Sequence, residues 1–221
     1  MSGVVALVGG GEWREGCTFD EGLLKSSGAD EVLVLPTAAA YEHPERAVET
    51  AVAYFSALGV KARGLSVLTR PDADVREHAL AVREARFLYL GGGSPLHLRS
   101  VLKETLVWEA ILLAWQEGAT VAASSAAAMV LTDPMVDPRG GAFTLGLGLI
   151  EQLAVIPHFD SWSHDKLHRT LTIAAAGLPV VGIPEQTALI READGSWRSE
   201  GVGDVAVFCD ATPADFTRLP G

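Results

Sequence analysis

The sequence predicts an α/β protein built on a doubly wound, mostly parallel β-sheet with helices on both faces. Two observations predict this fold. Short apolar runs alternate along the chain with longer stretches of helical character, which is the order of strand and crossover helix in a parallel sheet. The runs are apolar at nearly every position, as expected for strands that are covered on both faces. Right-handed crossovers are expected between the strands.

The predicted strands are short segments rich in Val, Leu, Ile and Ala, and they are expected to end at a common edge. They cover residues 4–8, 32–35, 62–66, 87–90, 120–122, 153–156 and 180–183. The predicted helices cover residues 19–27, 44–58, 74–84, 95–117 with a break near Glu104, and 162–176. Pro44 and Pro95 suit the first turn of their helices, where a missing N–H group costs nothing.

The pattern changes from Asp133 onwards. Residues 133–149, "DPMVDPRGGAFTLGLGL", are rich in Gly and Pro and predict loops with short strands. Residues 187–209 predict antiparallel hairpins, with Asp194-Gly195 as a turn signal. The chain shows no linker, internal repeat or low-complexity segment, so residues 1–221 are expected to form one domain.

Composition limits the classes of partner. The chain has 221 residues, of which 48% are hydrophobic, enough for a sizeable core. A net charge of −11 disfavours nucleic acid as a partner, because phosphate binding needs a positive surface. No apolar run approaches the ~20 residues that span a membrane, and the N-terminus has no basic signal segment. We expect a cytoplasmic protein with no nucleic-acid and no membrane partner.

The two cysteines predict neither a disulfide nor a metal site. Cys17 and Cys209 lie near opposite ends of the chain, and no C-x-x-C spacing occurs. Cys17 is an alternative nucleophile, but no predicted strand leads into it.

Functional side chains are sought at the carboxyl ends of the strands, where sites form in doubly wound sheets. The segments that follow the strands are "GGGEW", "PTAAAYEHP", "GGGSPLHL", "SSAAAM", "PHFD" and "PEQTA". The last three supply Ser, His and Glu, which are the residue types of a hydrolytic triad.

Ser125 is the candidate nucleophile. A sharp turn from strand to helix can hold one side chain exposed, and such a turn needs small neighbours, which Ala123, Ser124 and residues 126–128 supply. The N-terminus of the following helix favours a developing oxyanion. The alternative is that Ser124 or Ser125 is an ordinary helix N-cap.

The glycine loop is the second candidate. Gly91, Gly92 and Gly93 permit close backbone approach, and the loop lacks the lysine and spacing of a phosphate-binding loop. An oxyanion donor is the functional interpretation. The structural alternative is a tight turn with Ser94 as helix cap and Pro95 as the first helical residue.

The remaining candidates are a base and an acid. His158 follows a predicted strand and suits a general base. His164 and His168 have metal-ligand spacing but no evident third ligand, so no metal is expected. Glu185 would orient the histidine unless it is a solvated loop residue. Asp133, eight residues past Ser125, is the rival acid.

With these motifs the chain resembles the peptidase family that contains cyanophycinase and aspartyl dipeptidase (peptidase E). "ASSAAA" covers the family's elbow G-x-S-A-G-A, and "LGGGSPLHL" matches its glycine loop. "SAAAMVLTDPM", "GLGLIEQLAVIPHF" and "GIPEQTAL" resemble cyanophycinase segments. The resemblance implies a flavodoxin-like fold akin to class I glutamine amidotransferases. The site residues it implies are nucleophile Ser125, base His158, acid Glu185, oxyanion donors Gly93 and Ala126, and substrate contacts Gly92 and Ser94.

The implied function is a serine-type peptidase that hydrolyses small peptides, dipeptides or isopeptides, including Asp-containing ones, and needs no cofactor. In dipeptidase members the acid follows the nucleophile, which keeps Asp133 as an alternative. Ala127 replaces the second glycine of the elbow, and its methyl is expected to crowd or loosen the turn. The alternative function is therefore an inactive family member that binds a small ligand. The peptide is left open, and a homodimer is compatible with the sequence.

Overall fold

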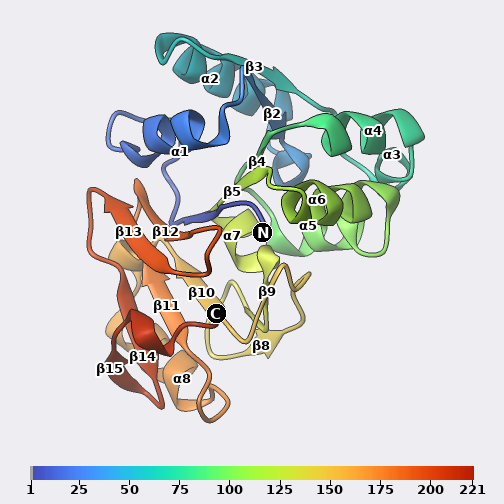
Figure 1. Ribbon diagram of the computed structural model, residues 1–221. Helices are drawn as coiled ribbons and strands as arrows, with labels where there is room; N and C mark the ends of the chain where they lie inside the picture. Colours follow the sequence, from blue (N-terminus) through green and yellow to red (C-terminus); the bar gives the residue numbers. More distant parts are fainter. Residues whose placement is uncertain (1) are drawn as a thin grey trace.

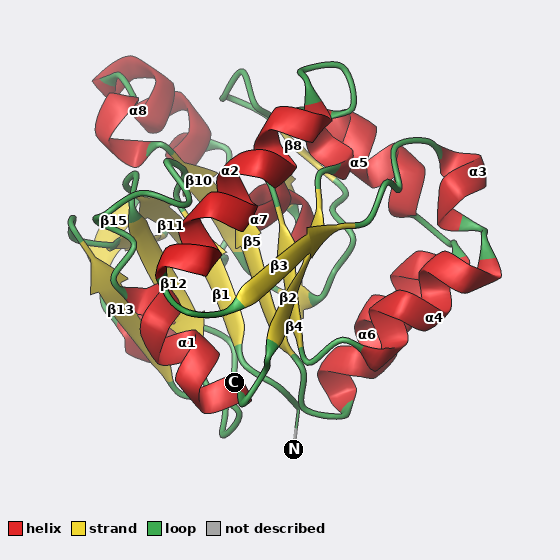
Figure 2. Ribbon diagram, turned by 90° about the horizontal axis from the view of Figure 1, so that it is seen from above, coloured by secondary structure: helices red, strands yellow, loops and turns green. Residues whose placement is uncertain are grey.

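A seven-stranded sheet lies at the centre of the computed structural model, which describes residues 2–221 (Figures 1 and 2). Its order is β13 (Trp197–Gly201), β12 (Thr187–Arg191), β1 (Val5–Val8), β5 (Thr120–Ser124), β4 (Phe87–Leu90), β2 (Glu31–Leu35) and β3 (Lys61–Gly64). The strands from β1 to β3 are parallel, and β12 and β13 are antiparallel. The prediction of an α/β protein with a mostly parallel sheet is confirmed.

Helices cover both faces of this sheet (Figure 2). On one face lie α1 (Phe19–Ser27) and α2 (Pro44–Ala57). On the other lie α3 (Arg70–Ala73), α4 (Arg76–Glu84), α5 (Pro95–Leu102), α6 (Leu106–Gln116) and α7 (Ala126–Leu131). Successive strand residues point to opposite faces. In β1, Val5 and Leu7 therefore join one core, and Ala6 and Val8 join the other.

A second, four-stranded sheet corrects one expectation. The runs at 153–156 and 180–183 are strands, β10 (Ala154–Pro157) and β11 (Val180–Ile183), but they lie outside the main sheet. They pair in parallel with each other and continue antiparallel into β14 (Ala206–Cys209) and β15 (Thr212–Ala214). Both sides of β1 are taken in the main sheet, by β12 on one side and β5 on the other. Figure 1 shows this second sheet below the main one, with α8 (His164–Thr172) beside it.

The segment after α7 consists of loops with short strands, as predicted. The strands β6 (Thr132–Asp133) and β9 (Ile150–Glu151) form one pair, and β7 (Met135–Val136) and β8 (Phe143–Thr144) form another. Short 3-10 helices are η1 (Thr37–Ala39), η2 (Phe159–Ser161) and η3 (Phe216–Arg218).

Two local predictions are also confirmed. The predicted break at Glu104 separates α5 from α6, and Glu104 has a φ of 56° there. The predicted hairpin turn at Asp194-Gly195 joins β12 to β13. Within residues 2–221, none of the helices combines the length and the apolar character needed to cross a bilayer.

Candidate active site

Ser125 lies at a sharp turn between β5 and α7. Its backbone has φ 52° and ψ −112°, and its N–H group donates to the Val8 carbonyl at 2.9 Å. This region is costly for a residue other than glycine. Ser125 takes the N-cap position of α7, but its hydroxyl makes no capping hydrogen bond. The side chain is therefore free to point elsewhere.

A chain of two hydrogen bonds begins at the Ser125 hydroxyl. Ser125 Oγ lies 2.7 Å from His158 Nε2, and His158 Nδ1 lies 2.9 Å from Glu185 Oε1. An ionised carboxylate can only accept, so Nδ1 carries the ring proton in this arrangement. Nε2 is then left to accept the hydroxyl proton of Ser125. The imidazole and the carboxylate are each about two-fifths exposed, with 37% and 38% of the side chain accessible, so solvent and substrate can reach them.

The "GGGEW" segment after β1 brings the two sheets together. The N–H of His158 donates to the Gly9 carbonyl at 2.7 Å, and the N–H of Gln186 donates to the Gly10 carbonyl at 2.7 Å. A side chain at Gly10 would overlap the His158 imidazole. The sequence analysis assigned no role to this segment, although three glycines directly after a strand indicate close backbone approach.

Ala127 does not loosen the elbow. It is fully buried in α7 and is not among the residues with positive φ. The position therefore has ordinary helical geometry. Alanine favours a helical backbone more than glycine does. The expected crowding is absent because the positive φ of the turn falls on Ser125 itself.

Two backbone N–H groups beside Ser125 are available to a ligand. The N–H of Gly93 and the first N–H of α7, at Ala126, have no acceptor within residues 2–221. Both residues line one pocket with Ser125. Gly93 has a φ of 136°, and a side chain there would overlap the Ala38 carbonyl, so only glycine fits.

Gly92 and Ser94, the two expected substrate contacts, have protein partners. The N–H of Gly92 donates to Glu12 Oε1 at 3.0 Å. The N–H of Ser94 donates to the Ala38 carbonyl at 2.8 Å, and its hydroxyl accepts from the N–H of His97 at 3.4 Å. Ser94 is thus the N-cap of α5, as the structural alternative had it.

The remaining candidates lie away from this chain of hydrogen bonds. Asp133 accepts from the N–H of Gly146 at 2.8 Å and makes no bond to His158. Burial raises the pKa of Cys17 to about 11, so its thiol is protonated near neutral pH and a poor nucleophile. His164 and His168 are not joined by a third ligand in the described part of the chain.

The pocket at Ser125 has a volume of about 380 Å³. Its lining residues are Gly93, Pro95, Ser125, Ala126, Met129, Pro138, Pro157, His158, Ser161, Trp162 and Lys166. Lys166 is the one lysine, arginine or carboxylate side chain among these residues. Its Nζ lies 3.9 Å from the centroid of the Trp162 ring and donates to the Pro138 carbonyl at 3.0 Å. Burial lowers the pKa of Lys166.

Sequence reasoning missed Trp162 and Lys166. The signal was their place in "DSWSHDKLH", directly after the candidate base. An aromatic residue and a cation within eight residues of the candidate base are candidates for the lining of its site.

Comparison with known sequences identifies relatives. The sequence matches the model of peptidase family S51 over residues 5–196. It is 26% identical over 197 residues to the cyanophycinase of Synechococcus elongatus, covering 83% of this chain and 60% of that protein. It is 29% identical over 168 residues to the cyanophycinase of Trichormus variabilis, covering 71% of this chain and 55% of that protein. The chain thus spans 60% or less of the length of these relatives.

Comparison with solved structures agrees. The crystal structure of a peptidase from an acI-B1 Actinobacterium superposes with a TM-score of 0.86 at 31% identity, covering 97% of this chain and 93% of that one. A putative peptidase E protein from Listeria monocytogenes EGD-e has a TM-score of 0.67 at 16% identity, covering 92% and 100%, which is evidence for the fold alone. The matched family region holds the elbow, the glycine loop, His158 and Glu185. The chain therefore belongs to peptidase family S51.

Proposed function

We propose that the protein is a serine peptidase that hydrolyses small peptides with Ser125 as nucleophile, His158 as base and Glu185 as orienting acid. The observation that carries the proposal is the pair of hydrogen bonds from Ser125 Oγ to His158 Nε2 and from His158 Nδ1 to Glu185 Oε1. The 2.7 Å between Ser125 Oγ and His158 Nε2 lies within the range of about 2.6–3.2 Å that proton transfer between such a pair needs.

The reaction proceeds in two halves. Ser125 Oγ attacks the scissile carbonyl while His158 Nε2 takes the hydroxyl proton, and the imidazolium is stabilised by Glu185. His158 returns the proton to the leaving amine as the tetrahedral intermediate collapses to an acyl-enzyme. Water then attacks the ester while His158 Nε2 takes a proton from it, and His158 returns that proton to Ser125 Oγ as the second tetrahedral intermediate collapses and the free acid leaves. The backbone N–H groups of Gly93 and Ala126 donate to the oxyanion of each intermediate.

The pocket favours a short substrate that carries a carboxylate. Its volume of about 380 Å³ suits a dipeptide or a small isopeptide, because ligand pockets of this size lie at the small end of the usual range. Lys166 is the charged residue of the lining that can attract a carboxylate. Asp-containing dipeptides and isopeptides meet both conditions.

A fluorophosphonate probe tests the nucleophile without knowledge of the substrate. It should label wild-type protein at Ser125, as located by mass spectrometry, and Ser125→Ala should not be labelled. A screen of dipeptides and isopeptides, each with and without an acidic residue, should then give hydrolysis that Ser125→Ala lowers about 10⁴-fold. Absence of both labelling and hydrolysis in the wild type would contradict the proposed function and favour the alternative of a ligand-binding family member.

Lys166 has its own test on a substrate from this screen. Lys166→Met, which keeps the length and loses the charge, should raise KM for carboxylate-bearing peptides and leave their neutral analogues unaffected. An equal effect on both kinds of peptide would argue against carboxylate recognition by this residue.

A further inference from the structure

Glu12 joins three segments that meet beside Ser125. It follows the three glycines after β1 and is half-buried. Its Oε1 accepts from the N–H of Gly92 at 3.0 Å, and its Oε2 accepts from the hydroxyl of Ser124 at 2.8 Å. One carboxylate thus connects the loop after β1 to the glycine loop and to the end of β5.

Each partner of Glu12 immediately precedes a residue of the proposed mechanism. Ser124 is completely buried and precedes the nucleophile Ser125. Gly92 precedes Gly93, which lines the pocket of Ser125 and whose N–H has no acceptor within residues 2–221. A Cβ atom at Gly92 would lie 3.2 Å from both Glu12 Oε1 and Ser125 Cβ, so these groups are packed without spare room. A shift of the carboxylate would therefore be transmitted to both residues.

We infer that Glu12 is a positioning residue that sets the distance between the nucleophile and the oxyanion donors. This role rests on the proposed function. Donors stabilise an oxyanion only when they are held at the right place before the charge forms, and a displacement of ~1 Å can cost about 100-fold in rate. The two bonds of Glu12 hold the glycine loop and the elbow in one arrangement.

Glu12 does not touch the substrate in this role. It is not among the residues that line the pocket, and both of its oxygens already accept hydrogen bonds. The two hydrogen bonds rather than the negative charge are therefore what the site uses. A glutamine can form both, because its oxygen can accept from Gly92 and its NH₂ can donate to the Ser124 hydroxyl.

The rate of fluorophosphonate labelling at Ser125 measures this role in the intact protein. Glu12→Ala should slow labelling about 10- to 100-fold, and Glu12→Gln should stay within a few-fold of wild type. Ser124→Ala removes one of the two hydrogen bonds, so its labelling rate should lie between those of Glu12→Ala and Glu12→Gln. Adding Ser124→Ala to Glu12→Ala should slow labelling no further, because the bond is already lost. With a peptide substrate, the loss should fall on kcat rather than on KM.

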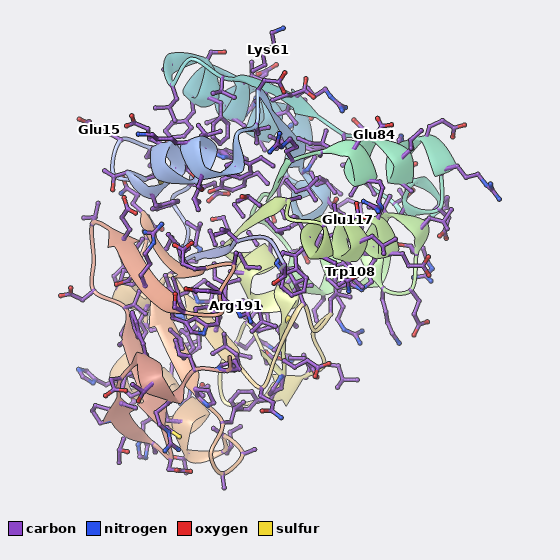
Figure 3. All side chains as sticks on the ribbon, viewed as in Figure 1. Glu15, Lys61, Glu84, Trp108, Glu117 and Arg191 are labelled. Atoms are coloured by element: carbon purple, nitrogen blue, oxygen red, sulfur yellow. The ribbon has the colours of Figure 1, made fainter. Side chains whose placement is uncertain are left out.

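Glu15→Ala is the matched control. Glu15 lies on the same loop, is exposed, and is drawn at the periphery of the molecule in Figure 3. This variant should label at the wild-type rate. Thermal unfolding of each variant shows that the loss of labelling is not a loss of fold.

The possible results separate this role from the proposed function. A wild type that is not labelled at Ser125 overturns the proposed function, and the role of Glu12 with it. A folded Glu12→Ala that labels at the wild-type rate overturns the positioning role alone. A Glu12→Gln as slow as Glu12→Ala also overturns it, because the charge would then be what matters. If Glu12→Ala does not fold, Ser124→Ala decides, and an unchanged rate in that variant overturns the inference.

Discussion

The backbone of Ser125 is held in a conformation that only glycine adopts at little cost. With φ 52° and ψ −112°, strain of about 1–3 kcal/mol is expected for any L-residue. The cost is tolerated because the backbone N–H is bonded to Val8 and the neighbouring alanines pack in the core. In this backbone conformation the hydroxyl of Ser125 bonds His158 and does not cap the helix.

Two variants that both lack the hydroxyl measure this strain. Ser125→Gly and Ser125→Ala should both be inactive, but Ser125→Gly should be the more stable by about 1 kcal/mol. Glycine relieves the strained φ, whereas alanine keeps it. Urea denaturation of the two proteins gives the difference. A more stable Ser125→Ala would mean that the turn relaxes when the hydroxyl is removed.

Two further variants test which carboxylate, Glu185 or Asp133, orients His158. Glu185→Gln should lower kcat at least about 100-fold, because the neutral amide can donate to Nδ1 and favour the wrong tautomer of His158. Asp133→Asn should leave kcat unchanged, because its amide oxygen can still accept from Gly146. Steady-state kinetics on both variants tests this. The reverse pattern would make Asp133 the orienting acid.

Among the elements, α7 is the short helix that supports the elbow. All six of its residues are buried, and its first residue, Ala126, lines the pocket of Ser125. Alanine at 127 suits both the helical backbone and the space available. The family's glycine is thus not required by the geometry at this position.

Ala127→Gly should therefore be harmful. It should lower the free energy of unfolding by about 1 kcal/mol, because glycine is the poorer helix former, and it should not raise kcat. Urea denaturation and kinetics on the same preparations test both parts. A rise in kcat would show that the methyl does hinder the elbow in solution.

At the scale of the whole molecule, a buried carboxyl makes stability depend on pH. Asp20 lies on α1, is fully buried, and has neither oxygen bonded to a side chain or backbone group of residues 2–221. Burial raises its pKa to about 8, and the nearby charges of Glu12 and Glu200 add to the increase. The folded state therefore keeps a proton that the unfolded state releases above about pH 4.

The sign of the effect follows from this difference in bound protons. Between the pKa of Asp20 in the unfolded state, about 4, and its pKa in the folded state, about 8, the folded state binds more protons. The free energy of unfolding therefore falls as the pH rises through this range. Asp20→Asn cannot ionise and should gain about 2–3 kcal/mol relative to wild type between pH 5 and pH 7. Denaturation at the two pH values measures this gain. A difference that does not change with pH would show that Asp20 titrates normally.

The sequence by itself determined the α/β class, the parallel strands and the turns. Apolar runs such as those of β1 and β4 cannot be left in water, and the glycine and proline signals at their ends allow few backbone conformations. Polar residues after predicted buried strands pointed to Ser124 or Ser125, His158 and Glu185, with Asp133 as a rival acid, and the family resemblance selected Ser125 and Gly93. That these residues act as nucleophile, donor, base and acid stays a prediction.

Only the tertiary structure decided which strands share a sheet and which acid reaches His158. Pairing between distant segments depends on which edges are free, and β12 and β5 take both sides of β1, while β10 and β11 pair with each other in a second sheet. Asp133 stayed a rival to Glu185 along the chain. The parallel pairing of β10 with β11, in which Pro157 lies opposite Ile183, brings Glu185 to the imidazole of His158. The two bonds of Glu12 join residues 80 and 112 positions apart, a distance over which no local pattern carries information.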